Sequence, residues 1–393
     1  MSILIKNGKV FLNGGLVEKN ILIIDNTIKQ ITSERVTVDK VINAMDKIIL
    51  PGMIDAHVHF REPGYIHKED FLSGSRAAAK GGVTTVLDMP NTNPPTASQQ
   101  LLDEKRELAK KSIVNYGFHF GATKDNSDEL RKMQNIASVK VFMDSSTGSM
   151  QIDDESILKK TFQNAKIISA HAEEKNVERA VDMILGSKNK LYLCHISLES
   201  ELKMVKKSMK HKIFCEATPH HLFLSQEDES KIVKMKPSLK SKQDQEALWK
   251  AIAENKIDTI ASDHAPHLLS EKESGDVYGV PGVETTLPLM LDAVNKNRIS
   301  LQKVIELCCH NPAKIFKIAN KGYIAEEYDA DIVIVDMNLE KEVKNEELFT
   351  KCGWSPFSGK VLKGCPVIAI VNGKIVYENG NVYDIKAREV EFQ

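Results

Sequence analysis

Residues 52–64, which read GMIDAHVHFREPG, contain the features that decide the fold. The apolar run predicts a buried strand over residues 53–59, and His57 and His59 stand at its end. Side chains two positions apart on a strand point to the same face, so both imidazoles can reach one metal ion. Arg61 follows at once, and its planar, permanently charged guanidinium is suited to binding a carboxylate through two contacts. The stretch therefore predicts a metal-binding strand end with an anion-binding group beside it.

The segment that begins with this strand alternates between strand-like and helix-like runs, which is typical of parallel strands joined by helical crossovers. The predicted strands cover residues 53–59, 83–89, 114–120, 138–143, 166–171, 191–195, 212–217 and 257–262. The predicted helices lie near residues 70–80, 98–111, 126–135, 153–163, 173–186, 199–209, 242–254 and 284–296. Eight such pairs predict a (β/α)8 TIM barrel over residues 51–321, with its reacting groups at the carboxyl ends of the strands.

The two ends of the chain share a different pattern. Residues 3–10 (ILIKNGKV) and 368–376 (IAIVNGKIV) both alternate around Asn-Gly, the favoured two-residue turn of a β-hairpin. We predict a hairpin at each end. Residues 1–50 and 322–393 are therefore expected to form one composite β-sandwich domain.

Residues able to bind a metal or a polar substrate occur at the ends of six of the eight predicted strands. They are His57 with His59, Asn91, Lys140, His171, His195 and Asp263. The histidines of the first strand and Asp263 predict one metal ion, and the other two histidines predict a second. An amine would repel two cations, but after reaction with carbon dioxide Lys140 becomes a carbamate whose two anionic oxygens can bridge them.

Each of these signals has a plainer alternative when it is taken alone. An HxH pair is more often structural or coincidental, a lysine between valines commonly lies at a strand edge, and an Asp-His pair is commonplace. The shared location at one end of one barrel favours a metal centre. The other histidines that fit no such pattern are interpreted as ordinary surface or core residues: His67, His119, His211 and His310.

The composition excludes several classes of protein. A chain of 393 residues with 42% hydrophobic and 27% charged residues is ordinary for a globular enzyme. The 53 basic and 54 acidic residues give a net charge of -1, so we expect a small-molecule substrate rather than nucleic acid or a membrane. The six cysteines form no CxxC pair, and no signal peptide or spanning run is evident, so a reduced, cytoplasmic protein is expected.

Seven motifs spread along the chain resemble those of one family. They are DAHVHFREPG, MPNTNPPT, SAHAEE, LCHIS, EATPHHL, SDHAPH and GVPGVETTLPL. In this order they resemble the landmarks of the amidohydrolase superfamily of cyclic amide hydrolases, and within it the dihydroorotases. The resemblance implies the reversible cyclisation of N-carbamoyl-L-aspartate to L-dihydroorotate in de novo pyrimidine biosynthesis. A contact with aspartate transcarbamoylase, the preceding pathway enzyme, is not derivable from the sequence.

The resemblance also implies a two-zinc site. The first ion would be held by His57, His59 and Asp263, and the second by His171 and His195, with carboxylated Lys140 as the bridge. Asp263 would act as general base and acid. The free carboxylate of the substrate would be bound by Arg61, Asn91 and His267.

The bridge has an alternative, because many bacterial relatives carry an aspartate there. Asp144 keeps this option open, although VKVFM aligns Lys140 with the lysine-bearing members. The loop DSSTGSMQ follows, and Ser146 or Thr147 could reach oxygens of a bound substrate if it closes over the site. A plain surface turn is the alternative for this loop.

A second loop differs from the family. The segment KMKPSLK, residues 234–240, carries Lys236 and Lys240 where the family usually has the asparagine and arginine of Asn-Pro-Pro-Leu-Arg. The resemblance therefore does not carry the family's substrate contacts over to this loop.

Arg61 separates the possible activities. Hydantoinases and dihydropyrimidinases act on rings that have no carboxylate, and allantoinases usually lack this arginine. Some relatives are non-catalytic scaffolds that keep the barrel but lose the ligands, whereas every expected ligand type is present here. The sequence therefore favours a dihydroorotase.

Overall fold

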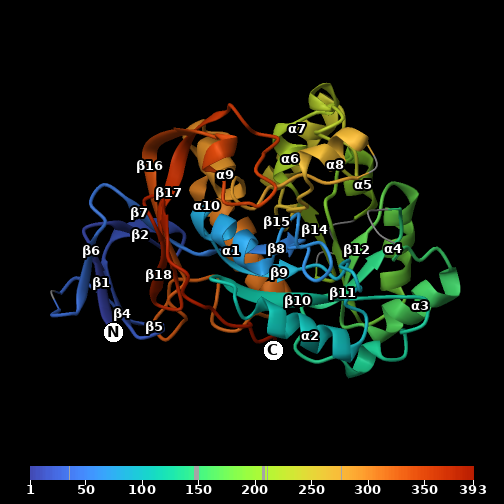
Figure 1. Cartoon of the computed structure of the whole chain (residues 1–393), viewed down its shortest axis with the longest axis horizontal. Helices are drawn as coiled ribbons and strands as arrows, with labels where there is room; N and C mark the ends of the chain where they lie inside the picture. Colours follow the sequence, from blue (N-terminus) through green and yellow to red (C-terminus); the bar gives the residue numbers. More distant parts are fainter. Residues whose placement is uncertain (35, 146–149, 206–208, 210, 276) are drawn as a thin grey trace.

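The computed structural model describes the chain except for residues 35, 146–149, 206–208, 210 and 276 (Figure 1). Its central sheet has eight parallel strands in the order β15-β14-β13-β12-β11-β10-β9-β8. Their bounds are β8 Met53–Val58, β9 Val83–Asp88, β10 Asn115–Gly121, β11 Ser138–Phe142, β12 Ile167–His171, β13 Lys190–Leu193, β14 Ile213–Ala217 and β15 Thr259–Ile260. A bridge between Val58 and His264, which follows β15, brings the two edges of the sheet together. The predicted barrel is confirmed.

Helices connect the strands and lie around the barrel (Figure 1). They are α1 Phe71–Lys80, α2 Gln99–Ala109, α3 Glu155–Asn164, α4 Lys175–Leu185, α5 Glu199–Met204, α6 Pro219–Phe223, α7 Lys242–Ala253, α8 Leu269–Ser274, α9 Thr286–Asn295, α10 Leu301–Ile305 and α11 Asn311–Ile315. A π-helical turn, η4 Glu306–His310, joins the last two, and 3-10 turns lie at η1 Leu130–Lys132, η3 Gln226–Asp228 and η5 Asn345–Glu347.

The helix predicted over residues 126–135 is wrong, because this stretch contains only the short turn η1. Asn126 explains the difference. Its side-chain oxygen accepts a hydrogen bond from the backbone N–H of Thr123, and its amide donates to the carbonyls of Ala97 and Gly121. These bonds to the backbone compete with a helical ladder.

Two further sheets combine strands from both ends of the chain. The four-stranded sheet has the order β5-β4-β1-β6, and the seven-stranded sheet has the order β19-β18-β17-β16-β7-β2-β3. The N-terminal strands are β1 Ser2–Lys6, β2 Lys9–Leu12, β3 Gly15–Glu18, β4 Asn20–Ile24, β5 Thr27–Thr32, β6 Lys40–Asn43 and β7 Ile48–Pro51. The C-terminal strands are β16 Ile332–Glu342, β17 Val361–Val371, β18 Lys374–Glu378 and β19 Asn381–Val382. The sheets share an isoleucine-rich core, to which both ends contribute.

Only one of the two predicted hairpins forms. At the C-terminal end, β17 and β18 pair across Asn372 and Gly373, whose φ angles of 47° and 71° suit the expected turn. The N-terminal hairpin is wrong, because β1 pairs with β4 and β6 whereas β2 pairs with β3 and β7. Asn7-Gly8 carries the chain from one sheet to the other. A Cβ at Gly8 would approach Ile49 Cδ1 to 2.8 Å, so the crossing is tightly packed.

The fold places the carboxyl ends of the barrel strands together, and the candidate residues with them. In the part of the chain that the structure describes, no helix is both long and apolar enough to cross a membrane.

Candidate metal centre and active site

A cavity lies where the carboxyl ends of the barrel strands converge. All of the residues predicted from strand ends line it, and so do several that were not. The lining residues are His57, His59, Arg61, Asn91, Lys140, Phe142, His171, His195, Lys236, Asp263, Ala265, Tyr278 and Gly279. His267 is fully buried and lies outside this lining, and Ser146 and Thr147 lie outside the described residues.

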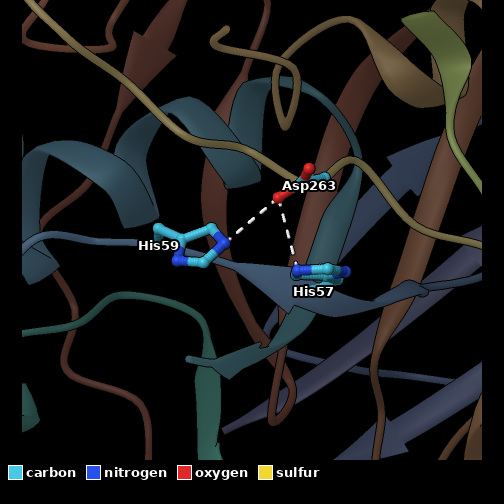
Figure 2. Close-up of side chains that lie close together, drawn as sticks. All are labelled: His57, His59 and Asp263. Carbon is cyan, nitrogen blue, oxygen red and sulfur yellow. Dashed lines mark hydrogen bonds and ion pairs between the residues drawn. The ribbon is translucent and has the colours of Figure 1, made fainter. Parts of the chain in front are cut away.

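Three of the lining residues, His57, His59 and Asp263, point toward one another (Figure 2). The Oδ1 atom of Asp263 lies 3.3 Å from Nε2 of His57 and 3.1 Å from Nε2 of His59. All three side chains are buried. Two imidazole nitrogens and one carboxylate oxygen that face one point form a ligand set suited to zinc.

Both imidazoles of this group are held uncharged. Burial lowers the pKa of His57 well below its usual value. Burial and then the charge of Arg61 do the same to the pKa of His59. A metal ligand must present a neutral imidazole with a free lone pair. The environment therefore prepares both rings for a cation.

The ring of His59 is oriented by Asn91. The side-chain oxygen of Asn91 lies 2.7 Å from Nδ1 of His59, so Nδ1 donates and Nε2 faces Asp263 with its lone pair. Asn91 was predicted to bind substrate, and it also lines the cavity. The structure thus gives this residue a contact with a candidate ligand that the sequence did not indicate.

Glu216 contacts the His57 ring on the side away from Asp263, and the sequence did not predict this residue. This fully buried carboxylate on β14 has its Oε1 atom 2.8 Å from Nδ1 of His57, and the same oxygen accepts a bond from the backbone N–H of His195. Its Oε2 atom accepts from the hydroxyl of Tyr192. Burial raises the pKa of Glu216 to about 8, while these donors favour the charged form. One carboxylate therefore fixes a member of each predicted ligand group.

His171 and His195 form the second group. The Nδ1 atom of His171 lies 2.8 Å from Nε2 of His195, at the ends of adjacent strands. The other nitrogen of His195 is buried and has no hydrogen-bond partner among the described residues. The two nitrogens that one ion between these rings would engage are therefore the facing pair, Nδ1 of His171 and Nε2 of His195.

Lys140 lies on β11 with its side chain fully buried. Its Nζ atom is 3.1 Å from Sγ of Cys194, whose pKa burial raises to about 12. Asp144, the alternative bridge, has both oxygens occupied by bonds from the backbone of Glu173 and the side chain of Asn176. It lines a neighbouring cavity rather than the central one. The geometry favours Lys140 over Asp144.

Arg61 reaches the cavity from the segment after β8. Its Nε atom donates to the carbonyl of Pro266, and Nη2 lies 2.9 Å from Nε2 of His267. His267 also lies 3.1 Å from Nζ of Lys68, so it stands between two cations. Burial lowers the pKa of Arg61 to about 10, which leaves the guanidinium charged at neutral pH. His267 is therefore placed to support Arg61.

Three site residues adopt a left-handed backbone. The φ angles are 64° at Arg61, 38° at His195 and 45° at Asp263. Such conformations cost a non-glycine residue about 1–3 kcal/mol each and cluster at functional sites. Here they direct a candidate anion-binding group and two candidate ligands into one cavity.

Comparison with known proteins places this arrangement among hydrolases. The model of the amidohydrolase family matches residues 48–376. A dihydroorotase from Pyrococcus furiosus is 38% identical over 397 residues, which cover 95% of this chain and 92% of that protein. One from Halobacterium salinarum is 37% identical over 385 residues, with coverage of 88% and 90%. Among solved structures, the L-hydantoinase (dihydropyrimidinase) from Arthrobacter aurescens has a TM-score of 0.94 at 27% identity and covers 99% of both chains.

Proposed function

Since the chain belongs to the amidohydrolase family, we propose that it is a dihydroorotase that interconverts N-carbamoyl-L-aspartate and L-dihydroorotate. The observation that carries this proposal is a buried arginine in the cavity of the candidate metal ligands. The α-carboxylate of the substrate is unchanged by the reaction and requires a fixed cation, which Arg61 provides. We place this step of pyrimidine biosynthesis in the cytoplasm.

The residues fit two zinc ions. His57, His59 and Asp263 would hold the first and His171 with His195 the second, with the carboxylated amine of Lys140 between them. The neutral rings of His57 and His59 and the facing nitrogens of His171 and His195 support this assignment. When bound, zinc lowers the pKa of water and polarises a carbonyl group.

The residues of the chain orient the substrate and move one proton. Arg61 binds the α-carboxylate through its guanidinium and so orients the ring with its amide bond toward Asp263. In ring opening, the carboxylate of Asp263 takes a proton from the attacking water and gives it to the departing ring nitrogen. Ring closure reverses both transfers. The contacts of Asp263 with His57 and His59 in the cavity support this role.

Hydantoinase activity is the second candidate, because solved hydantoinases share the fold over almost the whole chain. Their rings carry no carboxylate, so a buried arginine in the cavity would serve no purpose. The test is a purified enzyme assayed with dihydroorotate beside hydantoin, dihydrouracil and allantoin. We expect hydrolysis of dihydroorotate at a kcat/KM at least about a hundredfold higher than for the others, since a site built around a buried charge rejects substrates that leave it unpaired.

Metal analysis of the same preparation tests the non-catalytic alternative. An enzyme of the proposed kind should contain nearly two zinc ions per chain, whereas a scaffold relative should contain well under one. Preference for an uncharged ring would contradict the dihydroorotase assignment even in a fully loaded protein.

Glu216 should be required for metal retention. Removing the carboxylate in Glu216→Ala frees the ring of His57 and the backbone of His195, so we expect metal affinity to fall roughly 10- to 100-fold. Glu216→Gln keeps an acceptor oxygen in the same place and should lose far less. The measurement is the metal content of each variant after dialysis against graded concentrations of a chelator.

Asn115→Ala is the matched control for this experiment. Asn115 is also buried and donates to Thr84 and Asp331, but it lies outside the central cavity. An equal loss of metal in this variant would show that general loosening of the barrel, rather than Glu216, was measured.

A further inference from the structure

Asp88, the last residue of β9, forms a buried ion pair with Lys105 of α2. Its Oδ2 atom lies 2.5 Å from Nζ of Lys105, and both side chains are fully buried. Burial raises the pKa of Asp88, but the charge of Lys105 and a backbone hydrogen bond favour the carboxylate. Hydrophobic residues of similar volume often stabilise a core as well as a buried pair does. The pair therefore calls for an explanation other than stability.

The other oxygen of Asp88 holds the residue that precedes Arg61. The Oδ1 atom accepts a hydrogen bond of 2.7 Å from the backbone N–H of Phe60. Arg61 follows with a φ angle of 64°, a left-handed conformation that persists only when the surrounding structure holds it. The bond from Phe60 thus lies where the backbone turns to direct the guanidinium into the cavity.

Lys105 connects this anchor to a second one. Its Nζ atom also donates to the carbonyl of Met89 at 2.8 Å, so it holds two successive residues at the end of β9. The loop after β9 packs against the segment after β8. The backbone N–H of Asn93 donates to the carbonyl of Pro63 at 3.2 Å, and a Cβ at Gly64 would approach the carbonyl oxygen of Asn93 to 2.2 Å. The segment after β8 is therefore held by β9 at its start and by the loop after β9 further along.

The pair also acts on Arg61 through charge. Burial lowers the pKa of Arg61, and the carboxylates of Asp263 and Asp88 oppose this shift. Without Lys105, the carboxylate of Asp88 would be a buried anion that competes with an anionic substrate for Arg61. The ammonium of Lys105 balances this charge and leaves the guanidinium available to the substrate.

We propose that Asp88 and Lys105 are positioning residues for Arg61, which they hold in the orientation that binds the α-carboxylate of the substrate. Asp88 fixes the backbone before the guanidinium, and Lys105 holds Asp88 in place and balances its charge. Neither residue lines the central cavity, so both act through Arg61. This inference rests on the proposed dihydroorotase function.

Two variants that both lack the buried charges separate this role from stability. Asp88→Asn/Lys105→Met keeps an oxygen that can accept from Phe60, whereas Asp88→Ala/Lys105→Met has none. We expect the KM for dihydroorotate to stay within about threefold of normal in the first variant and to rise roughly five- to twentyfold in the second, because a displaced guanidinium binds the carboxylate poorly. The kcat of both should change less than about threefold, since the α-carboxylate is the same in the ground state and the transition state. Steady-state kinetics of ring opening measures these constants.

Lys105→Met alone leaves the carboxylate of Asp88 buried and unpaired. We expect its KM for dihydroorotate to rise about as much as in Asp88→Ala/Lys105→Met, and its Tm to fall. Adding Asp88→Asn should lower the KM again, because the unpaired charge is removed while the acceptor for Phe60 is kept. A lysine that only filled space would show no such reversal. If Lys105→Met does not fold, the two uncharged variants still decide the question.

The Arg61→Met background tests whether the pair acts through Arg61. There, Asp88→Ala/Lys105→Met should lower kcat/KM less than about twofold, because an absent guanidinium cannot be displaced. A pair that only stabilised the barrel would keep its full effect in this background.

Lys321→Met is the matched control. Lys321 is also a buried lysine, with Nζ 2.8 Å from Asp329 and 2.6 Å from Asp331, but this cluster lies in the segment before β16. We expect a lower Tm and a KM within about twofold of normal.

Three outcomes would overturn the inference. The asparagine and alanine variants of Asp88 could have the same KM, the alanine variant could keep its full effect in Arg61→Met, or Lys321→Met could raise the KM equally. Failure of the unmodified enzyme to open dihydroorotate would refute the proposed function, and the inference with it.

Discussion

Replacing Lys140 with alanine should reduce ring opening roughly a hundred- to a thousandfold, which is typical when one preorganised group of a metal centre is lost. The side chain is fully buried at the end of β11 and lines the central cavity. As a carbamate it would supply two anionic oxygens between two cations. The carbamate and the ions should stabilise one another, because each is unfavourable in this buried site alone. We therefore expect Lys140→Ala to lose metal as well as activity.

A short carboxylic acid should restore part of this activity. Alanine leaves a space in which an acetate or propionate can place two oxygens where the carbamate would lie. Lys140→Arg should not be rescued, because its longer side chain fills the space and keeps a positive charge. Activity and zinc content are measured with increasing concentrations of the acid.

Asp144 makes the competing prediction. If Asp144 were the bridge, Asp144→Ala would be inactive and Lys140→Ala would keep both activity and metal. The bonds that both Asp144 oxygens accept from the backbone of Glu173 and the side chain of Asn176 argue against this outcome. Electron density beyond Nζ of Lys140 in a crystal of the metal-loaded enzyme would identify the carbamate directly.

Replacing Arg61 with methionine should cost roughly 2 to 5 kcal/mol of transition-state stabilisation for dihydroorotate, as when one partner of a buried charge pair is removed. Methionine keeps the length of the side chain but has neither the charge nor the planar fork. Both residues carry a Cβ, so the left-handed backbone at this position gains no new strain. Steady-state kinetics should show a fall in kcat/KM with the larger part of the loss in KM.

Lys68→Met is the control for Arg61. Lys68 contacts His267 from the other side without lining the central cavity, so its loss should cost less than tenfold. Near-normal kcat/KM for dihydroorotate in Arg61→Met would mean that another group binds the α-carboxylate. The main argument against a hydantoinase would then fall.

The sequence predicted the parts of the fold and site that follow from periodicity. Alternating strands and helices indicated the barrel, and the rule that reacting groups lie at strand ends brought together His57, His171 and Asp263 in advance. Prediction from the sequence failed where the pairing of a strand depends on a partner that is distant in the chain. The Asn7-Gly8 signal suited a hairpin, but the strands on either side of it pair with other strands in different sheets.

The groups that support the site were also missed. Glu216 has no sequence spacing that relates it to His57, and only the closed barrel places its oxygen against that ring. Lys272 looks like an ordinary helical lysine until its contacts with three carbonyls are seen. A pattern of residue types indicates which side chains can react, whereas the contacts that orient them depend on the assembled structure.

The composite sheet has a consequence for synthesis on the ribosome. Strand β7 pairs with β16, and the pair Pro51 and Ile332 are 332 − 51 = 281 positions apart in the chain. At roughly 5–20 residues per second, the N-terminal strands wait on the order of 15–60 s for this partner to emerge. During that time β7, which pairs with β2 on its other side, exposes an unpaired apolar edge, which is a template for aggregation. We therefore expect the nascent chain to depend on chaperones until its C-terminal strands are made, after which β16 covers this edge.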